Sequence, residues 1–444
     1  MRHEPQPARP VPPFAERRAR LLAAMPDLSA AVFPAAAPAP RNGDVIHPYR
    51  QHSDLLYLTG FREPEAVAVL RKGLPGPTFA LFVRPRDREM EVWSGRRAGV
   101  EGAVRDHGAD EAFPMADLPR KFPELLREAR SLLVAFGRLG SFQAVLDEAL
   151  ASLRRAKRVP YWGPSVLIDP ETLLHELRLV KSPEELALMQ FAAAVSCEAH
   201  IAAMGRARPG MREYELQAIV EYTFRSRGAD GWGYPSIVGA GANGCVLHYE
   251  ENSSILDRRD LVLIDAGAEV DGYTADITRT FPAARSYKGA RRHLYEAVLD
   301  VQKRLVDAVR PGQTLHGLQD LTIRWLTEHM VTLGLLKGTV DQAIATRTYR
   351  RFYMHNVSHW LGLDVHDAGA YSVDGHPRPL APGMVLTIEP GLYVAPDAKG
   401  VPAAFRGIGV RIEDDVVVTE SGPRVLTAAA PKEIADIEGL RQGA

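Results

Sequence analysis

The 444-residue sequence has few cysteines, little net charge and no long apolar run. Its only cysteines are Cys197 and Cys245, too few for a disulfide framework, so we expect a reducing, cytoplasmic location. A formal net charge of −1 argues against a nucleic-acid partner. No apolar run approaches the ~18 residues that span a bilayer, and residues 1–25 lack the apolar core of a signal peptide. The composition therefore predicts a protein without nucleic-acid or membrane partners.

The pattern of apolar residues predicts two domains, 1–175 and 176–444. The first alternates apolar strand-like segments with helical stretches, which is typical of an α/β domain. Its strands are expected at 66–70, 78–83 and 131–136, and its helices at 14–25 and 142–156. Arg50, His52 and Asp54 in this domain have no accompanying nucleophile, so we interpret them as loop and interface residues.

The second domain is expected to be α+β. Ser182 followed by Pro183 and two glutamates predicts a capped helix start. Amphipathic helices are expected at 212–228 and 291–309, and short strands occupy much of the remaining sequence.

Five potential metal ligands are the main chemical feature of this second domain. Each lies in or at the end of a strand-like segment, in the order Asp265, Asp276, His359, Glu389 and Glu413. Four carboxylates and one imidazole suit hard or borderline divalent cations such as Mn²⁺, and carboxylates that can bridge favour two cations over one. Taken singly, any one of these residues could belong to an ordinary turn or to an ion pair. Their conjunction predicts a dinuclear hydrolase.

Asp265 and Asp276 lie symmetrically about a predicted hairpin turn between Val270 and Asp271. In a regular ladder the two carboxylates would face each other at about 5 Å and repel unless a cation or proton lay between them. The alternative is that Asp276 is simply exposed, because Asp is common near hairpin turns.

Three histidines, His355, His359 and His366, lie among apolar residues, where imidazoles are candidates for ligation or proton transfer. The spacing of His355 and His359 would also fit one face of a helix. Arg411 and Glu413 are two residues apart, hence on one strand face, where a buried ion pair is the structural alternative.

The ordered ligand pattern resembles the creatinase and methionine aminopeptidase superfamily, peptidase family M24. The flanking segments, between about residues 49 and 431, resemble aminopeptidase P, the Xaa-Pro aminopeptidase family. These segments are YRQHSDLLYLTGFREPEAV, VLHYEENSS, DAGAEVDGYTADITRTFP, MHNVSHWLGLDVHDAG, LTIEPGLYVAPD and FRGIGVRIEDD. The resemblance implies a creatinase-N-like α/β domain with a mixed sheet and helices, followed by an α+β pita-bread catalytic domain.

The resemblance also implies roles for individual residues. The five ligands would hold two divalent metal ions, most readily Mn²⁺ with Co²⁺ or Zn²⁺ as alternatives, and Asp276 and Glu413 would bridge them. The remaining candidates would contact substrate, stabilise the intermediate or lie near the centre. They are His248, His355, His366, Arg411 and Tyr371, with Trp93 reaching the active site of a neighbouring subunit.

The activity implied is release of the N-terminal residue from peptides with proline in second position, through a hydroxide bridging two Mn ions. Glu389 would carry the proton. The N-terminal domain would serve oligomerisation and substrate access in a homodimer or homotetramer. Two alternatives stay open: prolidase, a dipeptidase with the same dinuclear site, and a non-catalytic binding protein of the same fold.

Overall fold

The computed structural model describes residues 9–155 and 163–441. Residues 1–8, which belong to the N-terminal segment without a signal-peptide core, lie outside the described residues. The same holds for Ala156, the last residue of the helix expected at 142–156. The chain divides into two compact units. One is Val11–Arg178, and the other contains Leu179–Ala444 together with Arg9 and Pro10. The roles expected for the N-terminal domain, and its limits at 1–175, stay predictions.

A six-stranded mixed sheet forms the first unit, in the order β6-β5-β4-β1-β7-β8. The pairs β1/β4 and β4/β5 are antiparallel, and the other three pairs are parallel. This confirms the predicted mixed sheet. The strands are β1 (Ser29–Pro34), β4 (Val67–Lys72), β5 (Phe79–Val83), β6 (Glu111–Pro114), β7 (Ser131–Leu133) and β8 (Val166–Ile168).

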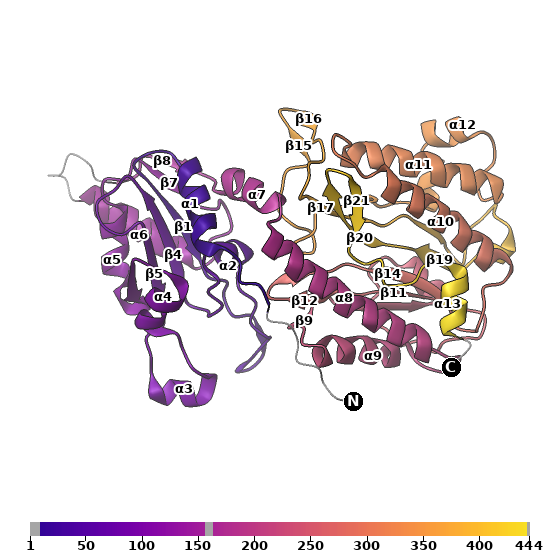
Figure 1. The fold of residues 1–444 in the computed structure, drawn as a ribbon, viewed down its shortest axis with the longest axis horizontal. Helices are drawn as coiled ribbons and strands as arrows, with labels where there is room; N and C mark the ends of the chain where they lie inside the picture. The colour runs from indigo at the N-terminus through magenta and orange to yellow at the C-terminus, as the bar shows by residue number, and fades with distance from the viewer. Residues whose placement is uncertain (1–8, 156–162, 442–444) are drawn as a thin grey trace. The chain divides into compact units, whose positions relative to one another are not determined.

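Helices cover both faces of this sheet (Figure 1). Ala30 and Val32 of β1 pack in the apolar cluster that contains α5 (Leu118–Leu126) and α6 (Phe142–Arg155). Ala31 and Phe33 are also buried and point to the opposite face, because side chains alternate along a strand. The other elements of the unit are α1 (Phe14–Ala24), α2 (Ser53–Thr59), α3 (Arg88–Ser94), α4 (Gly99–His107), α7 (Glu171–Leu179), β2 (Pro40–Asn42) and β3 (Val45–Ile46).

Asp54 is a buried helical residue, so its interpretation as a loop residue was wrong. It lies in α2 with 4% exposure, and Arg178 donates a hydrogen bond to its Oδ1 at 2.7 Å. His52 precedes the helix and accepts the N–H of Asp54 through Nδ1 at 3.3 Å, which makes it the N-cap. Both residues therefore have structural roles.

In the second unit, strands lie between the helices α8 and α9 on one side and α10 and α11 on the other (Figure 1). Ser182 caps α8 as predicted, because its hydroxyl accepts the N–H of Glu185 and the Glu185 carboxylate accepts the N–H of Ser182. The helices are α8 (Pro183–Arg206), α9 (Glu213–Ser226), α10 (Gly289–Ala308), α11 (Leu315–Thr332), α12 (Val340–Ala345) and α13 (Ile434–Leu440).

Helix α8 is long and apolar enough to cross a bilayer by length and composition alone. In the most apolar 18-residue stretch of α8, 56% of the residues are buried inside the unit. A core helix meets the same criteria, so α8 is weak evidence for a membrane span.

Short strands build the interior of this unit and confirm the predicted α+β class. Three of the sheets have the orders β10-β11-β14, β13-β12-β9 and β17-β20-β21, and β18 pairs with β19. These strands are β9 (Gly231–Trp232), β10 (Ile237–Ala240), β11 (Leu261–Asp265), β12 (Ala268–Val270), β13 (Tyr273–Thr274), β14 (Thr278–Pro282), β17 (Val385–Ile388), β18 (Gly391–Val394), β19 (Ile408–Arg411), β20 (Asp414–Thr419) and β21 (Gly422–Val425).

The predicted hairpin turn is centred one residue too early, so the predicted pairing of the two strands is wrong by two residues. Val270 pairs with Tyr273, so the turn is Asp271-Gly272, and both residues have positive φ, 51° and 85°, as a type I′ turn requires. Consequently Asp265 lies opposite Thr278 and not opposite Asp276. Asp276 is two residues from Thr278, which makes it a diagonal neighbour of Asp265 on the same face.

Candidate metal centre

A cavity of about 480 Å³ in the second unit brings ten of the eleven predicted site residues together. They are Asp265, Asp276, His359, Glu389, Glu413, His248, His355, His366, Tyr371 and Arg411. Trp93 is the exception. It lies on α3 of the other unit, is 85% exposed and does not line this cavity.

Strand ends supply the acidic side chains. Asp265 is the last residue of β11, Asp276 lies just before β14, Glu389 follows β17, and Glu413 precedes β20. His359 lies beside β17, where its carbonyl accepts the N–H of Thr387 at 3.0 Å. The described residues 352–371 contain no helix, so the helical alternative for His355 and His359 is wrong.

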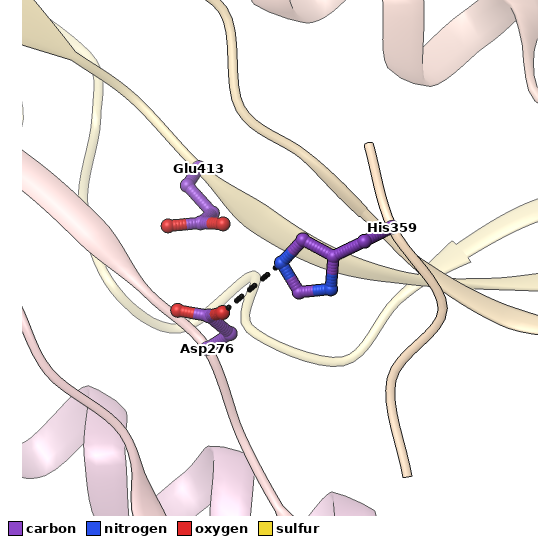
Figure 2. Close-up of side chains that lie close together, drawn as sticks. All are labelled: Asp276, His359 and Glu413. Carbon is purple, nitrogen blue, oxygen red and sulfur yellow. Dashed lines mark ion pairs between the residues drawn. The ribbon is translucent and has the colours of Figure 1, made fainter. Parts of the chain in front are cut away.

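Asp276, His359 and Glu413 form the tightest group, with ligand atoms that all lie within 4.8 Å of one another. Figure 2 shows these three side chains directed toward a common space. His359 Nε2 is 3.4 Å from Asp276 Oδ2 and 3.7 Å from Glu389 Oε1. A third acidic side chain, that of Glu389, therefore borders the same space.

The Tyr234 hydroxyl joins the two aspartates. It lies 2.6 Å from Asp265 Oδ1 and 2.5 Å from Asp276 Oδ1, so the carboxylates converge although they are not directly opposed. Sequence reasoning missed Tyr234. The local signal for it is only an aromatic residue before Pro235 in the segment between β9 and β10.

The carboxylates disfavour one another's charge. Burial, together with the neighbouring carboxylates, raises the pKa of Glu389 to about 7 and that of Glu413 well above its usual value. Burial also raises the pKa of Asp276, although a hydrogen bond with His359 opposes this. Oxygen and nitrogen donors with an excess of negative charge fit divalent cations. The residues of this cavity therefore suit a metal site.

Arg411 orients the acidic group through three hydrogen bonds. It donates to Asp265 Oδ2 at 2.6 Å, to Thr278 Oγ1 at 3.0 Å and to the Tyr393 hydroxyl at 3.1 Å. Thr278 in turn donates to Glu413 Oε2 at 2.6 Å. The carboxylate partner of Arg411 is thus Asp265, and Thr278 connects it to Glu413. Neither Thr278 nor Tyr393 was identified from the sequence.

His355 is held as a neutral imidazole. Its Nδ1 lies 2.7 Å from the Asn356 carbonyl, which only accepts, so Nδ1 carries the proton. Its Nε2 lies 2.9 Å from the Tyr393 hydroxyl. Burial, reinforced by the charge of Arg411, lowers the pKa of His355 to about 4.

Three further residues form the more exposed part of the cavity. The His366 ring lies edge-on to His359, with ring centroids 4.4 Å apart. His248 is exposed, and Tyr371 is 41% exposed beside the buried Trp360. These side chains can reach a ligand that enters the cavity.

Comparison with known proteins identifies both units. Residues 187–420 match the model of metallopeptidase family M24, and residues 14–134 match that of the aminopeptidase P N-terminal domain. The chain is 44% identical to the Xaa-Pro aminopeptidase of Escherichia coli K12, over 96% of this chain and 97% of that one. It is 41% identical to the Xaa-Pro aminopeptidase of Haemophilus influenzae, over 96% of each.

Solved structures give the same result. Aminopeptidase PepP of Pseudomonas aeruginosa has a TM-score of 0.95 at 47% identity, over 97% of each chain. Zinc-substituted E. coli aminopeptidase P in complex with product has a TM-score of 0.93 at 44% identity, over 96% of this chain and 97% of that one. These likenesses confirm the expected pita-bread fold. The chain belongs to metallopeptidase family M24, with the N-terminal domain of aminopeptidase P.

Proposed function

We propose that this protein is a metal-dependent Xaa-Pro aminopeptidase, which releases the N-terminal residue from peptides with proline in second position. The observation that carries the proposal is the convergence of Asp265, Asp276, His359, Glu389 and Glu413 in one cavity. The relatives at 41–44% identity bear the name of this activity.

The five donors would hold two divalent ions, with Asp276 and Glu413 shared between them. Their oxygen-rich chemistry favours Mn²⁺, with Co²⁺ or Zn²⁺ as alternatives. Such ions supply Lewis acidity, which activates water and polarises the carbonyl that precedes proline. A peptide bond to proline lacks an amide hydrogen, so a dedicated site is needed to position it.

The protein's own groups then have separate tasks. Glu389 accepts a proton and returns it to the leaving nitrogen, since its Oε2 is within 3.6 Å of His355 and its pKa is raised toward neutrality by burial. His366 stabilises the negative charge that develops on the carbonyl oxygen. Both ring nitrogens of His355 are engaged, by the Asn356 carbonyl and the Tyr393 hydroxyl, so His355 orients Tyr393 at the edge of the site. His248 and Tyr371, on the exposed part of the cavity, contact the substrate.

We also propose a homodimer or homotetramer in which the N-terminal domain, residues 1–175, provides contacts and limits substrate access. Trp93 and Val92 on α3 support this assembly, because they are 85% and 82% exposed and large apolar side chains gain from burial. The two thiols are both free, which agrees with a reducing, cytoplasmic location.

The activity is tested by offering Mn²⁺-loaded protein Arg-Pro-Pro and Arg-Pro, with and without a chelator. We expect arginine release from Arg-Pro-Pro that the chelator abolishes. Cleavage of Arg-Pro alone would assign the site to a prolidase-type dipeptidase. Absence of cleavage of either peptide by protein with stoichiometric bound metal would indicate a non-catalytic binding protein.

A further inference from the structure

A second cavity, of about 860 Å³, lies in the same unit and shares no lining residue with the candidate metal centre. The end of α8, the loop before β11, the end of β14 and the start of α10 form its walls. Leu261, the first residue of β11, lines it, whereas Asp265 at the other end of that strand lines the metal centre. Asp265 is four residues further along the strand than Leu261, a distance of about 13 Å.

The lining of this cavity is strongly basic. Eight of its residues are Arg or Lys, and Asp260 is its one acidic member. The whole chain has 54 basic and 55 acidic residues, so its charge is nearly balanced. The lining of this cavity, in contrast, has a large excess of positive charge. Three segments that are distant in sequence contribute most of it: Arg206 and Arg208, then Arg258 and Arg259, then Arg285, Lys288 and Arg291.

Only part of this charge has a structural role. Arg441 closes the end of α8, where it donates to the carbonyls of Met204 and Ala207. Arg259 pairs with Asp257 at 3.3 Å. The side chains of Arg206, Arg208, Arg258 and Lys288 form no hydrogen bond or ion pair with any residue that the structure describes. Cations gathered in this way repel one another unless an anion binds among them.

The start of α10 adds to the attraction for anions. Its N-cap is Lys288, no side chain caps its first N–H groups, and its first turn contains no acidic residue. Those N–H groups and the positive end of the helix dipole therefore favour a negative ligand. Ser286, Lys288 and Arg291 line the cavity at this helix end.

The remaining walls are apolar. Met211, Ile219, Leu261, Pro282 and Tyr287 line the cavity beside the cations. A volume of about 860 Å³ lies within the range of small-molecule sites. An arginine guanidinium can donate two parallel N–H groups to two oxygens of one phosphate. We propose that this cavity binds an organic anion of nucleotide size, with two or more phosphate groups among the arginines and an aromatic or apolar body against the apolar wall.

The experiment measures binding of ATP, pyrophosphate and adenosine to the full-length, metal-loaded protein by calorimetry. We expect ATP to bind most tightly, pyrophosphate more weakly and adenosine weakest, with an affinity for ATP that falls as salt rises. The double substitution Arg258→Gln and Arg291→Gln should weaken ATP binding by about tenfold or more, because it removes two charge-assisted contacts.

Two control variants test whether ATP binds in this cavity and not elsewhere on the protein. Arg292→Gln removes the neighbouring charge on α10, which pairs with Glu296 outside the cavity, and should leave ATP affinity unchanged. His359→Ala removes a candidate metal ligand and should also leave it unchanged. If wild-type protein fails to bind ATP and pyrophosphate, the proposal is wrong. It is equally overturned if His359→Ala abolishes binding while the arginine variant retains it, since the phosphates would then be at the metal centre.

Discussion

At the scale of single residues, Glu389 is the acidic group best placed to move a proton. Its two carboxylate oxygens lie 3.6 Å from His355 Nδ1 and 3.7 Å from His359 Nε2. Burial raises its pKa to about 7, and a bound cation would lower that value. A carboxylate held beside the reacting groups can accept a proton and release it again during turnover.

Replacing Glu389 with Gln tests this role. The amide cannot carry the proton, so turnover of Arg-Pro-Pro should fall by about 100-fold or more. The measurement pairs turnover with metal content, so that loss of an ion is distinguished from loss of proton transfer. Glu250→Gln is the matched control, because Glu250 lines the same cavity but is exposed. Turnover of Glu389→Gln near that of the wild type would remove Glu389 from the proton pathway.

Asp54 should make the stability of the N-terminal unit depend on pH. Burial would raise its pKa, but hydrogen bonds from His175 and Arg178 and the arginine charge outweigh it and hold the pKa well below its usual value. A carboxyl whose pKa is lower in the folded state stabilises the fold above about pH 4, and this contribution disappears as pH falls below that value.

The corresponding substitution is Asp54→Asn. It removes the carboxylate facing the buried Arg178 guanidinium and should lower the free energy of unfolding at pH 7 by about 3 kcal/mol. Urea unfolding between pH 3 and pH 7 should show a shallower acid dependence than in the wild type. Asp44→Asn, at an exposed position, serves as control. An acid dependence identical to that of the wild type would contradict the assignment.

The charged ligands of the centre could be identified from sequence, but their supporting hydroxyls could not. Carboxylates and imidazoles in apolar strands are unusual enough to be noticed. Tyr234 lies between β9 and β10, and Thr278 is the first residue of β14. Only the fold shows that the Tyr234 hydroxyl lies between Asp265 and Asp276 and that Thr278 donates to Glu413.

At the scale of elements, the segment from β11 to β14 determines how two of the ligands meet. Its turn is centred on Asp271-Gly272, one residue later than the sequence pattern indicated, because the type I′ turn needs two consecutive residues with positive φ. The chain between Asp265 and Ala268 then passes very close to the strand that carries Asp276. A Cβ on Gly267 would lie 1.7 Å from the Ala275 carbonyl oxygen.

Gly267→Ala should therefore push apart the two strands and move Asp276. A shift of about 1 Å at a catalytic group can reduce turnover by about 100-fold, so we expect a loss of that order together with weaker metal binding. Gly231→Ala is the matched control, since Gly231 pairs with β12 in the same sheet and has open space for a Cβ. Comparable turnover in the two variants would show that this close approach does not position Asp276.

At the scale of the whole molecule, ligands from five separate segments converge in the second unit. Helix caps, the α/β and α+β classes and the main helices followed from local patterns such as the capping box at Ser182. Local patterns do not show which strands become neighbours, because pairing depends on contacts between residues far apart in sequence. That part of the fold, including the pita-bread arrangement, came from the family resemblance.

The most direct test of the dinuclear centre is a metal titration of chelator-stripped protein, with bound Mn²⁺ per chain measured by mass spectrometry and hydrolysis of Arg-Pro-Pro recorded at each point. We predict two ions per chain at saturation, with activity that rises as the ions bind. His359→Ala should bind fewer ions and lose activity. Full hydrolysis by metal-free protein, or two ions per chain in His359→Ala, would contradict the assignment.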